Sequence, residues 1–343
     1  MLSSVLLLTV GLVILYYGAE FLVEGSSRIA LALGISPLIV GLTVVAFGTS
    51  APEFVVSLLS ALDGQPAIAV GNVVGSNLAN IALIVGCAAV IMPMAVDRQL
   101  LTRDYPAVLL LSALLLGAVY LGPGPGISRI ESLVLLAVFA GYLGLCIRAA
   151  LVQRRAFQAT QEYLAVGAAS NPDLAVASEI AVEAAEQKGG GLAVNLTKTV
   201  GGIVGLVIGA RMMVSAAVDI ASHFGVSELV IGMTVVAVGT SLPELATSVV
   251  AALRKEAELS LGNIVGSNIF NVGFVLGLVG IIRPIDVAPE ALRFDFPAMM
   301  LVTVLFFPIL IYNRKVSRLD AVVLLAMYFT FIGLTFVRAA NAG

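Results

Sequence analysis

The chain has 343 residues, of which 60% are hydrophobic and 11% are charged, and its mean hydropathy is +1.08. Soluble domains carry about 25% charged residues, so this composition excludes a soluble globular protein and predicts an integral membrane protein. The formal net charge of −3, with the cationic residues scattered between apolar runs, argues against a nucleic-acid partner.

Apolar runs follow one another along the whole chain. A spanning helix needs about 20 mostly apolar residues, and polar or Pro/Gly-rich breaks divide the chain into ten candidate spans. They cover residues 3–26, 35–60, 66–91, 105–121, 130–149, 196–221, 228–252, 259–282, 296–312 and 320–338. The first run has no basic residue before it and no evident cleavage site, which favours a retained span. The sequence therefore predicts an all-α membrane protein with ten transmembrane helices.

Two stretches of the chain repeat each other at a spacing of 191 residues. Residues 41–86 and 232–277 are identical at 21 of 46 positions, mostly at Gly, Thr, Ser, Pro, Glu and Asn. Five spans separate each residue from its counterpart, and an odd number of spans reverses the direction through the membrane. We therefore expect two inverted five-helix repeats, in 1–150 and 196–343, an architecture that secondary transporters use.

The distribution of Lys and Arg predicts the orientation. With the N-terminus outside, 13 of these 18 residues lie on the inner side, where they are favoured. We therefore expect a multi-pass protein of the cell inner (plasma) membrane, with both termini on the outer side. The segment 151–195 is expected to be a cytoplasmic linker loop with room for one surface helix, and its acids lack the spacing of an EF-hand calcium site.

Each repeat places a carboxylate inside an apolar run. In each, a Thr, a Ser and a Glu fall within one helical turn: Thr49, Ser50 and Glu53, then Thr240, Ser241 and Glu244. Pro52 and Pro243 have no N–H, so carbonyls one turn earlier lose their helical partner. Ala46 and Ala237 would offer further backbone oxygens where the helix is unwound. A carboxylate at mid-bilayer costs about 2.5–3.5 kcal/mol and usually marks an ion path or proton relay.

The following span of each repeat adds amides and hydroxyls. They are spaced four residues apart on one helix face: Asn72, Ser76 and Asn80, then Asn263, Ser267 and Asn271. This all-oxygen set suits hard cations such as Ca²⁺ and Na⁺ and does not suit Zn²⁺. We interpret Cys87 and Cys146 as small buried side chains and His223 as an interfacial one. One Ca²⁺ would neutralise both glutamates.

Purely structural interpretations stay open for parts of this pattern. The GxxxG spacings permit close helix packing, and Ser or Thr hydroxyls often bond back to their own helix. Glu20, Glu24, Arg211 and Asp219 in the first and sixth spans are either gating contacts or side chains that reach the interface.

The repeated GTSxPE and GNxxGSN motifs resemble the sodium/calcium exchanger family of the cation/Ca²⁺ antiporter superfamily. The resemblance covers both repeats, and it implies that the second, third, seventh and eighth spans form the ion site while the first and sixth slide across them. It implies the metal ligands Ala46, Thr49, Ser50, Glu53, Ser76, Asn80, Ala237, Thr240, Ser241, Glu244, Ser267 and Asn271. Glu53 and Glu244 would bridge Ca²⁺, and the other groups would complete flanking Na⁺ sites.

The resemblance implies a transporter rather than an enzyme, without a cofactor. It would exchange Ca²⁺ for Na⁺, usually three, by alternating access. A Ca²⁺/H⁺ or other cation/Ca²⁺ antiporter of the same fold is the alternative, and a cation channel is a weaker one. Asn271 stands where K⁺-dependent members have Asp, which disfavours K⁺ co-transport. The expected partners are Ca²⁺, Na⁺ and the lipid bilayer; a monomer is plausible, and the oligomeric state is open.

Overall fold

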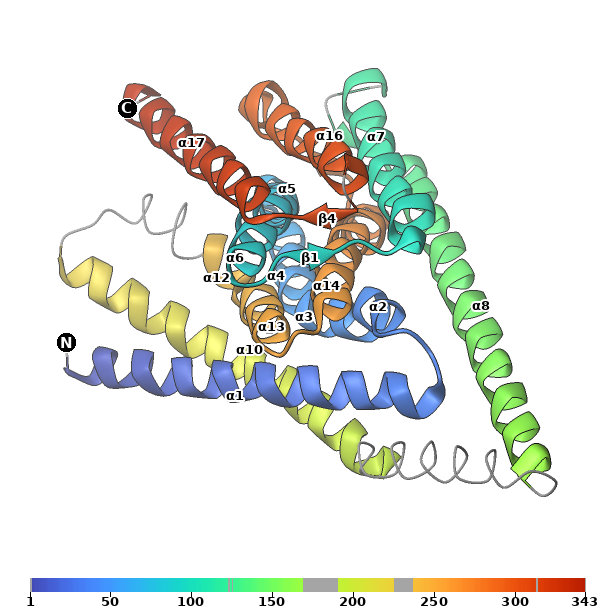
Figure 1. Ribbon diagram of the computed structural model, residues 1–343. Coiled ribbons are helices and arrows are strands. Elements are labelled where there is room, and N and C mark those ends of the chain that lie inside the picture. Colours follow the sequence, from blue (N-terminus) through green and yellow to red (C-terminus); the bar gives the residue numbers. More distant parts are fainter. Residues whose placement is uncertain are drawn as a thin grey trace.

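The computed structural model describes residues 2–122, 124, 126–168, 191–224, 237–312 and 314–342, and most of them are helical (Figure 1). The first half contains α1 (Leu2–Leu33), α2 (Pro37–Val40), η1 (Gly41–Val45), α3 (Ala46–Thr49), α4 (Ala51–Leu62), α5 (Pro66–Ala79), η2 (Asn80–Ile84), α6 (Val85–Ile91), β1 (Met94–Ala95), η3 (Leu100–Asp104), α7 (Tyr105–Leu121), β2 (Gly126–Ile127) and α8 (Arg129–Ala168). The second half contains α10 (Leu192–His223), α12 (Ala237–Thr240), α13 (Leu242–Leu253), α14 (Ala257–Ile269), η5 (Phe270–Leu276), α15 (Gly277–Ile282), β3 (Ile285–Asp286), η6 (Ala291–Asp295), α16 (Phe296–Tyr312), β4 (Lys315–Val316) and α17 (Arg318–Ala342). The segments labelled η are π-helical turns.

The helices confirm a multi-span membrane protein. Eight helical runs among the described residues are long and apolar enough to span a membrane: Leu2–Leu33, Ala67–Ile91, Leu100–Leu121, Arg129–Tyr163, Leu192–His223, Ala257–Ile282, Ala291–Tyr312 and Arg318–Arg338. A ninth candidate is the pair Pro37–Thr49 and Ala51–Leu62, which is bent by 43°. The predicted span 228–252 lies partly outside the described residues, so the number ten remains a prediction.

Helix α8 is longer than the sequence pattern predicts. We expected the span to end at 149, but the helix continues to Ala168, so the expected linker begins as helix. The charged residues near position 150 end the apolar run, but Arg and Gln are good helix formers and do not end the helix itself. Residues 169–190 lie outside the described part of the chain.

The most buried helices occupy the centre of the molecule. In the most apolar windows of Ala67–Ile91 and Ala257–Ile282, 72% and 83% of the residues are buried, against 28% in α1 and 22% in α10. Figure 1 shows α1 and α10 lying side by side along one flank, with α3–α6 and α12–α14 beside them and α7 next to α16 on the far side. The two GNxxGSN motifs therefore lie on the most deeply buried of the long apolar helices.

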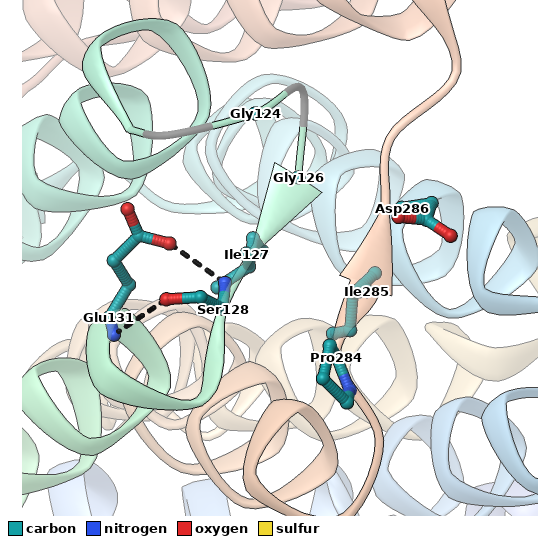
Figure 2. A pocket seen from close by; sticks show the side chains of 8 residues that line it. All are labelled: Gly124, Gly126, Ile127, Ser128, Glu131, Pro284, Ile285 and Asp286. Atoms are coloured by element: carbon teal, nitrogen blue, oxygen red, sulfur yellow. Dashed lines mark hydrogen bonds between the residues drawn. The ribbon is translucent and has the colours of Figure 1, made fainter.

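Two short strand pairs join the halves. Strand β1 pairs with β4 and β2 pairs with β3, both antiparallel. Figure 2 shows how the second pair leads into α8: Ser128 N–H donates to Glu131 Oε2 at 2.7 Å, and Glu131 N–H donates to Ser128 Oγ at 3.4 Å. Ser317 and Asp320 bond in the same way before α17. Such capping boxes satisfy N–H groups that a helix start leaves free.

Glycines bring α1 and α10 into backbone contact. A Cβ added at Gly18 would lie 2.7 Å from the backbone N of Leu206, and one added at Gly202 would lie 2.5 Å from the backbone N of Leu22. No side chain fits at these distances, because the obstructing atoms belong to the other helix's backbone. The two helices therefore pack as one unit through small residues, as membrane helices often do.

Replacement of Gly202 by Leu should separate α1 from α10. Overpacking of this kind costs about 1–3 kcal/mol, so we expect a lower thermal unfolding midpoint in detergent. Gly201→Leu is the matched control, because a Cβ at that neighbouring position meets nothing within 4 Å. Equal midpoints for the two variants would contradict the tight packing.

Candidate ion-binding site

The repeated TSxPE stretch folds as a break between two helices. Ser50, between α3 and α4, has φ −83° and ψ 5°, and Ser241 before α13 has φ −86° and ψ 6°. Pro52, in the first turn of α4, cannot continue the hydrogen-bond ladder of α3. The breaks place Glu53 and Glu244 in the first turn of a new helix, where the helix dipole favours a carboxylate.

Each of the two glutamates accepts a hydrogen bond from the serine of the other half. Ser50 Oγ donates to Glu244 Oε1 at 3.0 Å, and Ser241 Oγ donates to Glu53 Oε1 at 3.4 Å. All four side chains are at most 3% exposed. The two bonds cross between the helix breaks, so they bring both carboxylates into one buried cluster.

Asparagines of α5 and α14 extend the crossing pattern. Thr240 Oγ1 donates to Asn72 Oδ1 at 3.2 Å, and Thr49 Oγ1 donates to Asn263 Oδ1 at 3.0 Å. The amide groups of the two asparagines donate in turn to Ser57 Oγ and Ser248 Oγ, at 3.0 and 3.1 Å. Each asparagine thus fixes the threonine of the opposite half and the helix that carries its own half's glutamate.

The expected ligands Asn80 and Asn271 bind two further asparagines, Asn268 and Asn77, which were not singled out in the sequence. Asn80 Nδ2 donates to Asn268 Oδ1 at 2.9 Å, and Asn271 Nδ2 donates to Asn77 Oδ1 at 3.1 Å. Asn77 and Asn268 also donate to each other's backbone carbonyls, at 3.3 and 3.4 Å. The signal was present, because both are the last residue of the repeated GSN motif.

Several buried oxygens of this cluster have no hydrogen-bond partner in the described part of the chain. They are Glu53 Oε2, Glu244 Oε2, Asn80 Oδ1, Asn271 Oδ1 and Ser76 Oγ. The first four are two pairs related by the 191-residue spacing, and a carboxylate or an amide oxygen can only accept. Buried acceptors without donors are costly, and carboxylate, amide and hydroxyl oxygens are the ligands of hard cations.

The structure brings the expected site residues together. Those with described side chains are buried or half-buried in this cluster: Ala46, Thr49, Ser50, Glu53, Ser76, Asn80, Thr240, Ser241, Glu244, Ser267 and Asn271. Ala237 is the first residue of α12, and its side chain lies outside the described part. In that part, no three His, Cys, Asp or Glu side chains gather as a metal cluster, so two carboxylates among neutral oxygens define the chemistry.

Known proteins resemble the chain over most of its length. The family model "Sodium/calcium exchanger protein" matches residues 3–148 and 196–337. The chain belongs to the sodium/calcium exchanger family. It is 33% identical to the sodium/calcium exchanger MaX1 of Methanosarcina acetivorans, over 96% of this chain and 98% of the relative. It is 37% identical to the inner membrane protein YrbG of Escherichia coli, over 89% and 88% of the two chains.

A solved structure shares the fold. The sodium-calcium exchanger NCX_Mj, soaked with 2.5 mM Na⁺ and 0.1 mM Ca²⁺, superposes with a TM-score of 0.77 at 29% identity, and the match covers 97% of this chain and 98% of that one. Members of this exchanger family are transporters, and no catalytic family is indicated.

Calcium should stabilise the protein through the paired glutamates. A ligand at about 100 times its Kd adds about 2.7 kcal/mol to the free energy of unfolding, so Ca²⁺ should raise the thermal midpoint in detergent. Glu53→Gln and Glu244→Gln keep the side-chain shape but remove a negative charge, and both should lose most of this gain. Glu162→Gln, at an exposed position of α8, should keep it; equal gains in all variants would exclude the glutamates as ligands.

Proposed function

We propose that the chain is an electrogenic antiporter that exchanges one Ca²⁺ for three Na⁺ by alternating access. The observation that carries the proposal is the symmetric set of buried acceptor oxygens on Glu53, Glu244, Asn80 and Asn271, which have no donors in the described part of the chain. A divalent cation between the two carboxylates offsets both charges. The names of MaX1 and NCX_Mj, two sodium/calcium exchangers, support the same pair of ions.

The ligands divide into a central site and two flanking sites. Ca²⁺ takes 6–8 oxygen ligands, and Glu53 and Glu244 form the centre of its site. The remaining hydroxyls, amides and carbonyls of the cluster complete Na⁺ sites on either side: Ala46, Thr49, Ser50, Ser76 and Asn80, then Ala237, Thr240, Ser241, Ser267 and Asn271. Asn271 gives the site an amide where an Asp would add a third carboxylate.

The proposed architecture is two inverted five-helix repeats, in 1–150 and 196–343, joined by the 151–195 linker. The matched elements support it: α4 and α13 each have 12 residues, and both are preceded by a serine with the same backbone conformation. The crossing hydrogen bonds between halves fit a twofold axis through the site. We further propose an inner-membrane location with both termini outside, which agrees with the name of YrbG.

Alternating access requires α1 and α10 to move over the central helices. In this structure Arg254, after α13, forms an ion pair with Glu20 of α1, and Ser27 Oγ donates to Glu256 Oε1 at 2.8 Å. Glu24 also forms an ion pair, with Lys198 at 2.9 Å. Two of the candidate gating residues, Glu20 and Glu24, therefore have charged partners. The contacts of Arg254 and Glu256 hold α1 against the turn between α13 and α14, and the pair of Glu24 and Lys198 joins α1 to α10.

The residues that correspond to Glu20 and Arg254 at the 191-residue spacing, both in the described part of the chain, do not form a salt bridge in this structure. Glu20 corresponds to Arg211 of α10, and Arg254 corresponds to Asp63 after α4. The acid therefore lies on the first helix in one half, and the base lies on the equivalent helix in the other half. Arg211 lines a cavity of about 270 Å³ between α10 and α4, together with Gly239 and Thr240. Among the described residues, neither Arg211 nor Asp63 forms a salt bridge. In the alternate state, Arg211 would pair with Asp63 while Glu20 leaves Arg254.

Paired cysteines can follow this exchange. In a background without Cys87 and Cys146, Glu20→Cys with Arg254→Cys should cross-link in the state described here. Arg211→Cys with Asp63→Cys should cross-link in the opposite state. Reversal of the Na⁺ gradient across proteoliposomes should change the two yields in opposite directions; yields that rise and fall together would contradict the mechanism.

Counter-ion dependence tests the transport reaction directly. An outward Na⁺ gradient should drive ⁴⁵Ca²⁺ into proteoliposomes, and uptake should be faster when valinomycin and K⁺ relieve the membrane potential, because one net charge moves, worth about 2.3 kcal/mol per 100 mV. Uptake driven by a pH gradient and indifferent to Na⁺ would identify a Ca²⁺/H⁺ antiporter. Currents that reverse at the equilibrium potential of one ion would identify a channel.

A further inference from the structure

A largely apolar cavity is lined both by polar residues of the ion-binding cluster and by a carboxylate outside it. The cavity has a volume of about 400 Å³ and lies between α5, α12, η6 and α17. From the cluster it is lined by Asn72, Ser76 and Thr240, and from η6 it is lined by Asp295. Since a water molecule occupies about 30 Å³ of liquid, a hydrated cation fits in this space.

Asp295 has no close partner of its own. It is half-buried in a candidate span, and among the described residues it makes no hydrogen bond or ion pair. Arg338 of α17 attracts it electrostatically, but that guanidinium is exposed and lies over the ring of Phe294, 4.3 Å from its centroid. A carboxylate within a membrane span is costly, and such residues usually mark ion paths.

The corresponding carboxylate of the first half, Asp104, has different surroundings. Asp104 ends η3 as Asp295 ends η6, 191 residues later. Asp104 is fully buried, and its Oδ1 accepts from Arg103 Nε at 2.6 Å and from the Tyr142 hydroxyl at 3.1 Å. Where the first half has Arg103, the second has Phe294, so Asp295 lacks the adjacent cation.

Asp295 lines its cavity directly, whereas another cavity is lined by Tyr142, the partner of Asp104, and not by Asp104 itself. The one near Tyr142 has a volume of about 330 Å³ and is lined by Phe47, Phe139 and Phe270, and it reaches neither Asn263 nor Ser267. The cavity at Asp295 reaches the equivalent residues Asn72 and Ser76. The cavity on the Asp295 side therefore reaches polar residues of the cluster, and the cavity near Tyr142 does not reach their counterparts.

Ser76 supplies an independent indication of a ligand. Its side chain is 2% exposed, lines the cavity, and its Oγ has no hydrogen-bond partner in the described part of the chain. Buried hydroxyls are normally bonded. Ser76 and Asp295 therefore line the same cavity, one from the ion cluster and the other from outside it.

We propose that Asp295 is a cation-capture residue, which holds a hydrated Ca²⁺ or Na⁺ in this cavity before the ion passes to Ser76 and the glutamates. This inference rests on the proposed antiport function. A carboxylate in a cleft raises the local concentration of cations, and the effect grows with ionic charge. Asp295 thus affects how readily an ion reaches the site, without being one of the ligands at its centre.

Asp295→Asn should change the concentration dependence of transport and leave its maximum rate intact. In ⁴⁵Ca²⁺ uptake driven by Na⁺, we expect the half-saturating Ca²⁺ concentration to rise about three- to tenfold, which is at or below the lower end of the effects that charge steering by whole clefts produces, because one charge is removed. The rise should be smaller for Na⁺, because it carries one charge, and should shrink in high choline chloride, because salt screens the carboxylate. Asp295→Glu keeps the charge and should show the same dependence on Ca²⁺ concentration as the wild type.

Asp286→Asn is the matched control, because Asp286 is an exposed carboxylate of β3 that does not line this cavity. It removes the same charge and should leave the Ca²⁺ dependence unchanged. An unchanged half-saturating concentration in Asp295→Asn, or a loss of maximum rate alone in a variant that keeps its thermal midpoint, would overturn the inference. Absence of Na⁺-driven uptake in the wild type would instead overturn the proposed function.

Discussion

Two buried carboxylates, each bound by the serine of the opposite half, set the conditions for the rest of this structure. A glutamate cannot remain charged in a lipid-shielded interior without compensation. Ser50 and Ser241 bond one oxygen of each carboxylate, and the second oxygen of each has no protein donor in the described residues. The site is therefore satisfied by the protein only in part, as suits a cargo ion that must also leave.

Hydrogen bonds between asparagine side chains fix the orientation of the amide oxygens near the two glutamates. Asn80 begins the π-helical turn η2 and Asn271 lies within η5, and such turns are frequent at functional sites because they reorient side chains inside a helix. Their Nδ2 groups are fixed by Asn268 and Asn77, so their free Oδ1 atoms have a defined direction. The central helices are thus cross-linked by polar bonds, whereas α1 and α10 contact each other through glycine surfaces.

The two halves are equivalent in the site and different around it. Glu20 and Arg254 are paired, whereas Arg211 and Asp63 form no salt bridge among the described residues. Asp104 is bound by Arg103 and Tyr142, whereas its counterpart Asp295 borders a cavity that reaches Asn72 and Ser76. A transporter built from repeats needs such differences, because access from one side must be open when access from the other is closed. In the proposed antiporter the symmetric cluster binds the ion, and the unequal surroundings decide how it arrives.

The sequence by itself determined the membrane class, the 191-residue repeat and the TSxPE clusters, because hydropathy and identity are properties of the chain. It also placed Asn72, Ser76 and Asn80 on one helix face, since periodicity specifies the faces of a single helix. It did not single out Asn77 or Asn268, and it gave α8 too early an end, because an apolar run reports lipid contact and not helix length. Only the tertiary structure decided that each serine meets the glutamate of the other half, and that Asp295 and Asp104 differ in surroundings, because contacts between helices depend on how the helices cross.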